Sequence, residues 1–97
     1  MLYVLICTDK PGSLAVRQEN RPAHLDFLNS LGPALKAGGP FTADDGEKPN
    51  GSLVVIEAAS LADARAIAAK DPYAKAGLFQ SVDIRPWKWL LKNPESA

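Results

Sequence analysis

Residues 21–31 read Arg21-Pro22-Ala23-His24-Leu25-Asp26-Phe27-Leu28-Asn29-Ser30-Leu31. Four of them recur at i, i+3, i+4 and i+7, the spacing of one helix face: His24, Phe27, Leu28 and Leu31. Proline interrupts a helix but is tolerated at its first position. We therefore predict a kink or a restart at Pro22, with His24 near the start of the helix and turned toward the core.

Strands are predicted on both sides of this helix. Residues 1–8 are apolar on both faces and are followed by the turn Asp9-Lys10-Pro11-Gly12, which is typical of a central strand. After Gly32-Pro33 the chain returns as a strand over residues 34–41, and its Gly38-Gly39-Pro40 segment indicates a bulge or a close approach to the backbone. The polar residues 44–51 are interpreted as a long hairpin connection and a candidate mobile flap.

The second half of the chain is also predicted to run strand, helix, strand. A strand is predicted over 52–58, a helix from Ser60 to about residue 70, and a short turn over 73–77 after Asp71-Pro72. The last strand, 78–87, is predicted to alternate, with even-numbered residues on one face and odd-numbered residues on the other. Phe79, Ser81, Asp83, Arg85 and Trp87 fall on the second face.

Two strand–helix–strand units with right-handed crossovers predict an α+β, ferredoxin-like βαββαβ fold. Its four-stranded antiparallel sheet carries both helices on one face. Residues 1–97 form a single domain of ordinary size, with a tail beyond about residue 91 that we expect to be loosely ordered. The other sheet face exposes large aromatic side chains, which favours a homodimer through that face, with Trp87 and Trp89 as core or dimer anchors.

The composition excludes several partners. Eleven basic and eleven acidic side chains give a net charge of zero, so we expect neither nucleic acid nor membrane as a partner. The short apolar start lacks the features of a signal peptide, which predicts a cytoplasmic protein. One histidine and one cysteine make a dedicated metal site unexpected, and Cys7 is interpreted as a small buried residue.

The predicted topology brings His24, Asp71, the Gly38–Pro40 segment and the polar loop to one end of the sheet. Histidine takes up and releases protons near neutral pH, and a carboxylate beside it can orient the ring, as in an acid–base site. A structural role, in which both residues only tie helix ends to the sheet, stays open.

Several short motifs together resemble the YciI-like (YCII-related) family. They are Tyr3-Val4, Arg21-Pro22-Ala23-His24-Leu25, Ala37-Gly38-Gly39-Pro40, Gly51-Ser52 and Asp71-Pro72-Tyr73-Ala74-Lys75-Ala76-Gly77. The resemblance implies a dimeric α+β barrel in which His24 and Asp71 act together. It also implies that Gly38, Gly39 and Pro40 match the family's glycine–proline turn and that Ser52 matches its serine. Characterised members resemble lyases that remove hydrogen chloride from chlorinated lactones or hydroquinone breakdown products without a redox cofactor. The loop between the second and third strands is shorter and more acidic here than in some relatives, so the identity of the substrate is the family property that carries over least to this chain.

Two functions follow as hypotheses. In the first, the protein is a cofactor-independent lyase or isomerase of small organic acids or lactones, in which His24 moves a proton and Asp71 holds its tautomer. Backbone N–H groups near Gly39 and Ser52 would bind an oxyanion, and the candidate substrate contacts are Arg21 and Tyr73. In the alternative, the chain is a non-catalytic small-ligand-binding or accessory dimeric module, Arg21 is a solvated charge, and Tyr73 only packs.

Overall fold

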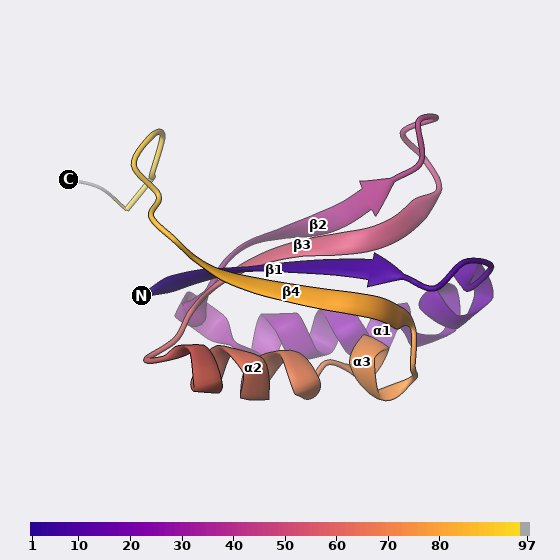
Figure 1. Ribbon diagram of the computed structural model, residues 1–97, viewed down its shortest axis with the longest axis horizontal. Helices are drawn as coiled ribbons and strands as arrows, with labels where there is room; N and C mark the ends of the chain where they lie inside the picture. Colours follow the sequence, from indigo (N-terminus) through magenta and orange to yellow (C-terminus); the bar gives the residue numbers. More distant parts are fainter. Residues whose placement is uncertain (96–97) are drawn as a thin grey trace.

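The computed structural model describes residues 1–95 and confirms the predicted fold. The elements in chain order are β1 (Leu2–Asp9), α1 (Leu14–Ser30), a 3-10 turn (Gly32–Ala34), β2 (Leu35–Thr42), β3 (Pro49–Glu57), α2 (Leu61–Ala69), α3 (Pro72–Lys75) and β4 (Phe79–Trp87). The antiparallel strands lie in the order β2-β3-β1-β4. The helices cover one face of the sheet (Figure 1). Residues 96 and 97 of the expected loose tail lie outside the described residues.

The core lies between the two central strands and the helices. On β1, alternate residues Tyr3, Leu5 and Cys7 are buried, and Val54 and Ile56 of β3 lie beside them. Alternation of this kind places one side of each strand against the helices. Across residues 1–95, no helix is long and apolar enough to span a bilayer.

Helix α1 is continuous through Pro22, so the expected interruption there is wrong. Ser13 occupies the N-cap position, but its side chain makes no capping hydrogen bond. Buried residues lie on both sides of Pro22, at Arg17, His24 and Leu28. Tertiary packing of this face outweighs the local cost of proline, which removes a single backbone hydrogen bond. As a result His24 sits in the middle of a long helix instead of at its start.

The predicted alternation of the last strand is wrong at its beginning. The partner of Thr8 is Ser81 and the partner of Asp9 is Phe79, so Gln80 is an extra residue in a β-bulge. The bulge changes the face of the residue before it, and Phe79 packs against the core instead of facing the open side. Beyond the bulge the alternation holds, since Ile84 pairs with Leu5 and also contacts the core.

The predicted start of α2 is confirmed, because the Ser60 side chain accepts a hydrogen bond from the backbone N–H of Asp63 at 3.1 Å. The region after Asp71 differs from the prediction. Instead of a turn, the residues after Asp71 form the short helix α3. Asp71 is its N-cap residue, and the Asp71 side chain accepts a hydrogen bond from the backbone N–H of Tyr73.

Gly51 is the position in the sheet where a side chain is least tolerable. A Cβ atom there would lie 2.5 Å from the backbone carbonyl oxygen of Cys7. Since backbone in a central strand cannot move without breaking its ladder, we expect Gly51→Ala to lower the free energy of unfolding by about 1–3 kcal/mol in a urea titration. The matched control is Gly39→Ala, where a Cβ atom meets nothing within 4 Å. Equal stability of the two variants would contradict this packing.

Candidate active site

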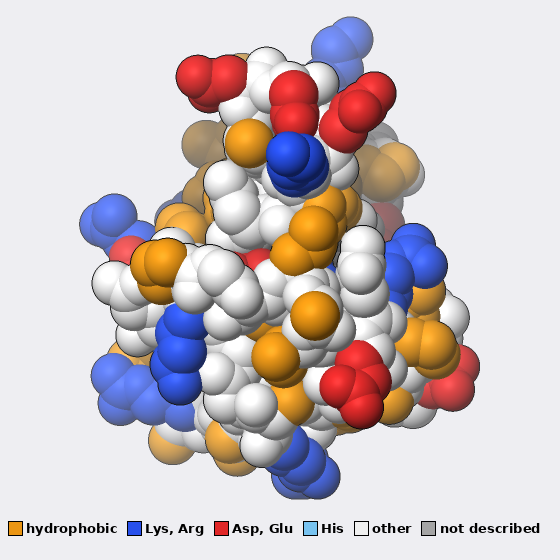
Figure 2. Space-filling model, turned by 90° about the vertical axis from the view of Figure 1, so that its right-hand side faces the viewer, with side chains coloured by type: hydrophobic (Ala, Val, Ile, Leu, Met, Phe, Trp, Pro, Cys, Tyr) orange, Lys and Arg blue, Asp and Glu red, His pale blue; other side chains and the backbone are white. Residues whose placement is uncertain are grey.

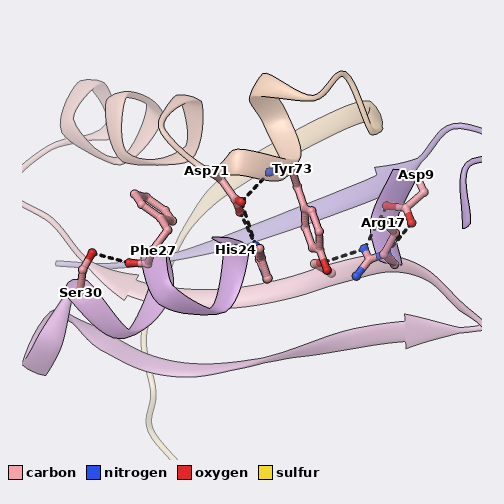
Figure 3. Close-up of polar contacts among 8 residues, drawn as sticks. Asp9, Arg17, His24, Phe27, Ser30, Asp71 and Tyr73 are labelled. Carbon is pink, nitrogen blue, oxygen red and sulfur yellow. Dashed lines mark hydrogen bonds and ion pairs between the residues drawn. The ribbon is translucent and has the colours of Figure 1, made fainter. Parts of the chain in front are cut away.

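His24 and Asp71 form a buried hydrogen-bonded pair. The Nδ1 atom of His24 lies 2.8 Å from Oδ1 and 2.9 Å from Oδ2 of Asp71 (Figure 3). An ionised carboxylate only accepts hydrogen bonds, so Nδ1 is the donor in this pair, and in the neutral form of the ring Nε2 is the nitrogen with the lone pair. The backbone N–H of Tyr73 donates to the same Oδ1 atom at 2.9 Å. Asp71 is therefore fixed from two sides and holds the imidazole in one tautomer.

A cavity of about 380 Å³ lies in front of this pair, bounded by α1, β2 and β3. Its polar and glycine lining includes Arg17, Arg21, His24, Gly38, Ser52 and Tyr73. Within residues 1–95, Nε2 makes no hydrogen bond, and no side-chain nitrogen or oxygen is both unpaired and shut off from solvent. The free nitrogen of His24 therefore opens into the cavity, where it can exchange a proton with a bound molecule.

Tyr73 lies between His24 and Arg17 (Figure 3). Its ring is stacked on the imidazole with a centroid distance of 3.9 Å and an interplanar angle of 14°. The guanidinium carbon of Arg17 lies 4.7 Å from the Tyr73 centroid, a cation–π distance. Burial raises the pKa of Tyr73, and the positive charges of Arg17 and Arg21 oppose that rise only in part. The phenol is therefore a protonated donor at neutral pH.

Arg17 is the residue of this site that the sequence interpretation missed. It is 4% exposed. Its Nε and Nη2 atoms donate to the Asp9 carboxylate at 2.7 and 3.0 Å, and Nη2 also donates to Ser52 Oγ at 2.8 Å. Burial by itself lowers the pKa of Arg17, but the hydrogen bonds and charge of Asp9 raise it overall. Arg17 stands seven residues before His24, and this i, i+7 spacing identifies it only if the helix runs through Pro22.

The other residues expected at the site also line the cavity, but from different positions. Gly38, Gly39 and Pro40 line the cavity from the middle of β2, and the exposed Arg21 stands at its rim. Ser52 also lines it, but in the central strand β3 it pairs with Cys7 on one side and Pro40 on the other. Because the backbone of Ser52 is used by the sheet, the group that Ser52 offers to the cavity is its hydroxyl and not the backbone N–H. This hydroxyl accepts a hydrogen bond from Arg17.

The polar loop predicted over 44–51 reaches the His24 cavity only at Pro49, the first residue of β3. None of residues 43–48, the tip of the hairpin, lines that cavity. Ala43 and Lys48 border a second cavity of about 550 Å³ beside the turn that follows β1. Figure 2 looks at this end of the molecule, with the acidic tip of the hairpin at the top. The cavity is lined by residues from the middle of β2, whereas the hairpin extends past the end of the sheet (Figure 1).

No group of three or more His, Cys, Asp or Glu side chains within residues 1–95 is arranged to hold a metal ion.

Cys7 lies close behind the site and is 4% exposed. Burial, with a smaller contribution from the negative charge of Asp71, raises the pKa of its thiol from 9.0 to about 12. We expect iodoacetamide at pH 8 to label Cys7 only after denaturation, because the thiolate is the reactive form. Since the unfolded thiol ionises first, this group makes the folded state progressively less stable as the pH rises from 9 to 12. Labelling of the native protein at the denatured rate would contradict a buried, protonated thiol.

Comparison with known proteins supports the fold and the family. The YCII-related domain matches residues 1–88. Protein YciI of Escherichia coli O6:H1 is 42% identical over 96 residues, covering 91% of this chain and 97% of YciI. An uncharacterised Haemophilus influenzae protein is 36% identical over 95 residues, with the same shares covered.

Solved structures show the same architecture. The 5-chloro-2-hydroxyhydroquinone dehydrochlorinase TftG of Burkholderia phenoliruptrix AC1100, in complex with 2,5-dihydroxybenzoquinone, is 37% identical with a TM-score of 0.82, covering 91% of this chain and 94% of TftG. A NIPSNAP family protein of Agrobacterium tumefaciens has a TM-score of 0.58 at 17% identity, covering 98% and 97% of the two chains, and shares the fold alone. On the matching domain and on the identity to YciI over nearly the whole chain, this protein belongs to the YCII-related family.

Proposed function

We propose that this protein is a lyase that eliminates hydrogen chloride, or an equivalent small acid, from a small oxygenated ring compound. The observation that carries the proposal is the buried His24–Asp71 pair whose free nitrogen opens into a cavity of about 380 Å³. The likeness to the dehydrochlorinase TftG, at 37% identity, supports the same class of reaction.

In the proposed step, Nε2 of His24 removes a proton from the ring compound. The electron pair of the broken bond to hydrogen forms a new double bond, and the carbon–chlorine bond breaks with its pair leaving on chloride. The ring compound loses one hydrogen and one chlorine, with no electron donor or acceptor consumed. The reaction is redox-neutral, so we propose that it needs no redox cofactor.

Asp71 and the cavity lining have separate parts in this step. Asp71 keeps Nδ1 protonated, so that Nε2 is the basic atom, and it stabilises the imidazolium that forms. Arg21 and Tyr73 supply donors for the negative charge that develops on the ring oxygens. Gly38 keeps the cavity open, because a Cβ atom there would point toward Leu28 and Val54, about 4.0 Å from each.

The test is chloride release. The wild-type protein is incubated with 5-chloro-2-hydroxyhydroquinone, the compound named for TftG, and with chlorinated lactones, and chloride is measured with an ion-selective electrode. We expect release well above the spontaneous rate for at least one of these compounds. Binding of these compounds without release would instead favour a non-catalytic ligand-binding module.

We also propose a homodimer formed through the sheet face that the helices leave uncovered. Val4 and Leu53 are only partly buried on that face, and Trp87 is 41% exposed. Sedimentation equilibrium is expected to show twice the chain mass, and Leu53→Glu to shift it toward the monomer. The cross-strand partners of Leu53, Ile6 and Gly39, offer no opposite charge, so the buried carboxylate is unpaired. A monomeric wild-type protein would contradict this assembly. We also keep the cytoplasmic location expected from the sequence as a proposal.

A further inference from the structure

The His24 cavity is lined by two arginines whose hydrogen-bond donors are only partly used by described carboxylates. The Nε and Nη2 atoms of Arg17 are used by Asp9 and Ser52. Its Nη1 atom, which forms no hydrogen bond within residues 1–95, is not closed to solvent. The Tyr73 hydroxyl interacts with the same guanidinium. Arg21 forms no ion pair with any described carboxylate. Two guanidinium groups therefore face one cavity with donors to spare.

The helix sets these groups in line with the base. Arg17, Arg21 and His24 stand at i, i+4 and i+7 of the continuous helix α1, which is one helix face. All three line the cavity, together with Tyr73.

The carboxylates are placed on the other side of these groups. Asp9 pairs with Arg17 and Asp71 with His24, and of the described residues no Asp or Glu lines the cavity. The positive groups are thus held from behind and face the cavity, which favours a negatively charged ligand.

We propose that Arg17, Arg21 and Tyr73 form an anion subsite that binds a negatively charged oxygen of the ligand, so that the substrate enters as a phenolate, enolate or carboxylate. This inference rests on the proposed function in one respect: it places the substrate in the same cavity. Arg17 is held in position by Asp9 and Ser52 before any ligand arrives, and its planar fork suits an oxygen anion. Asp9 neutralises the charge of Arg17, so the net positive charge of the subsite comes from Arg21.

The test compares two ligands that carry no chlorine. Calorimetry measures the dissociation constants of 2,5-dihydroxybenzoquinone, which ionises, and of 2,5-dimethoxybenzoquinone, which cannot. We expect the wild-type protein to prefer the acidic quinone by at least about 100-fold, because two charged hydrogen bonds contribute about tenfold or more each. A variant that loses one of them should lose about 10- to 100-fold of this preference.

Two variants remove the two arginines. Arg21→Met is at an exposed position and should fold normally. Arg17→Met alone leaves the Asp9 carboxylate buried and unpaired, so Asp9→Leu is combined with it, since replacing both partners of a buried ion pair is often tolerated. Arg65→Met, an exposed arginine of α2 outside the cavity, is the matched control. A purely structural role of Arg17 would weaken both quinones equally and leave the preference unchanged.

The outcomes separate this proposal from the lyase function. A preference that falls in both cavity variants but not in Arg65→Met supports the anion subsite, even if the protein releases no chloride. A preference that is the same in all the variants overturns the subsite, even if chloride is released. Failure of both quinones to bind the wild-type protein at millimolar concentration overturns it as well.

Discussion

His24→Asn is expected to lower the rate of chloride release by about 10²- to 10⁴-fold, the usual contribution of a general acid–base residue. An asparagine amide can still donate to Asp71 from the position of Nδ1, so the local hydrogen bond is kept. It offers no basic nitrogen to the cavity, and proton removal falls to water. Steady-state kinetics by chloride electrode measures the loss.

Thermal unfolding of the same variant separates a catalytic from a structural His24. A histidine that only ties α1 to α3 contributes stability, and its replacement should lower the melting temperature by several degrees. Replacement of a catalytic residue often leaves stability unchanged or raises it. Normal turnover together with a lowered melting temperature would contradict the catalytic assignment.

Asp71→Asn is the second large effect, with an expected loss in turnover of about 10²- to 10⁴-fold. If the amide oxygen keeps the bond from the Tyr73 N–H, the amide nitrogen takes the position of Oδ2, 2.9 Å from Nδ1. The amide nitrogen then opposes a proton on Nδ1, although the amide oxygen still lies 2.8 Å from that atom, so the tautomer with the proton on Nε2 gains population. That tautomer presents no base to the cavity, and the charge that stabilised the imidazolium is also gone.

The fold of Asp71→Asn should survive, because asparagine caps a helix about as well as aspartate. Asp63→Asn makes the same chemical change at an exposed position in the first turn of α2 and should leave turnover unchanged. Wild-type turnover by Asp71→Asn, or an equal loss in both variants, would count against Asp71 as the partner that sets the tautomer.

The sequence predicted those parts of the fold that depend on local pattern. Two runs that are apolar on both faces became the central strands β1 and β3, and Ser60 caps α2 as its spacing indicated. Two expectations failed where tertiary contacts outweigh local preference. Packing on both sides of Pro22 keeps α1 continuous, and a bulge at Gln80 turns Phe79 toward the core. Neither effect is visible in a hydrophobic pattern alone.

The candidate site divides in the same way. Strand directions and the family resemblance both brought His24 and Asp71 together, and the structure gives their separation as 2.8 Å. The role of Arg17 was missed because it depends on tertiary packing, which buries its ion pair with Asp9. An unbroken helix would have placed it two turns before His24, on the same face. The whole loop was assigned to the site, although only its residue Pro49 lines the cavity, because topology gives the end of a sheet but not how far a cavity extends.

The central claim is that Asp71 fixes the tautomer of His24 and leaves Nε2 free for a ligand. His24 is the single histidine of the chain, so a long-range proton–nitrogen NMR spectrum of the imidazole reports on this residue alone. At a pH where the ring is neutral, we expect a protonated Nδ1, an unprotonated Nε2, and a change in the Nε2 resonance when 2,5-dihydroxybenzoquinone is added. A proton on Nε2 in the free protein, or an Nε2 resonance unchanged at saturating quinone, would contradict the claim.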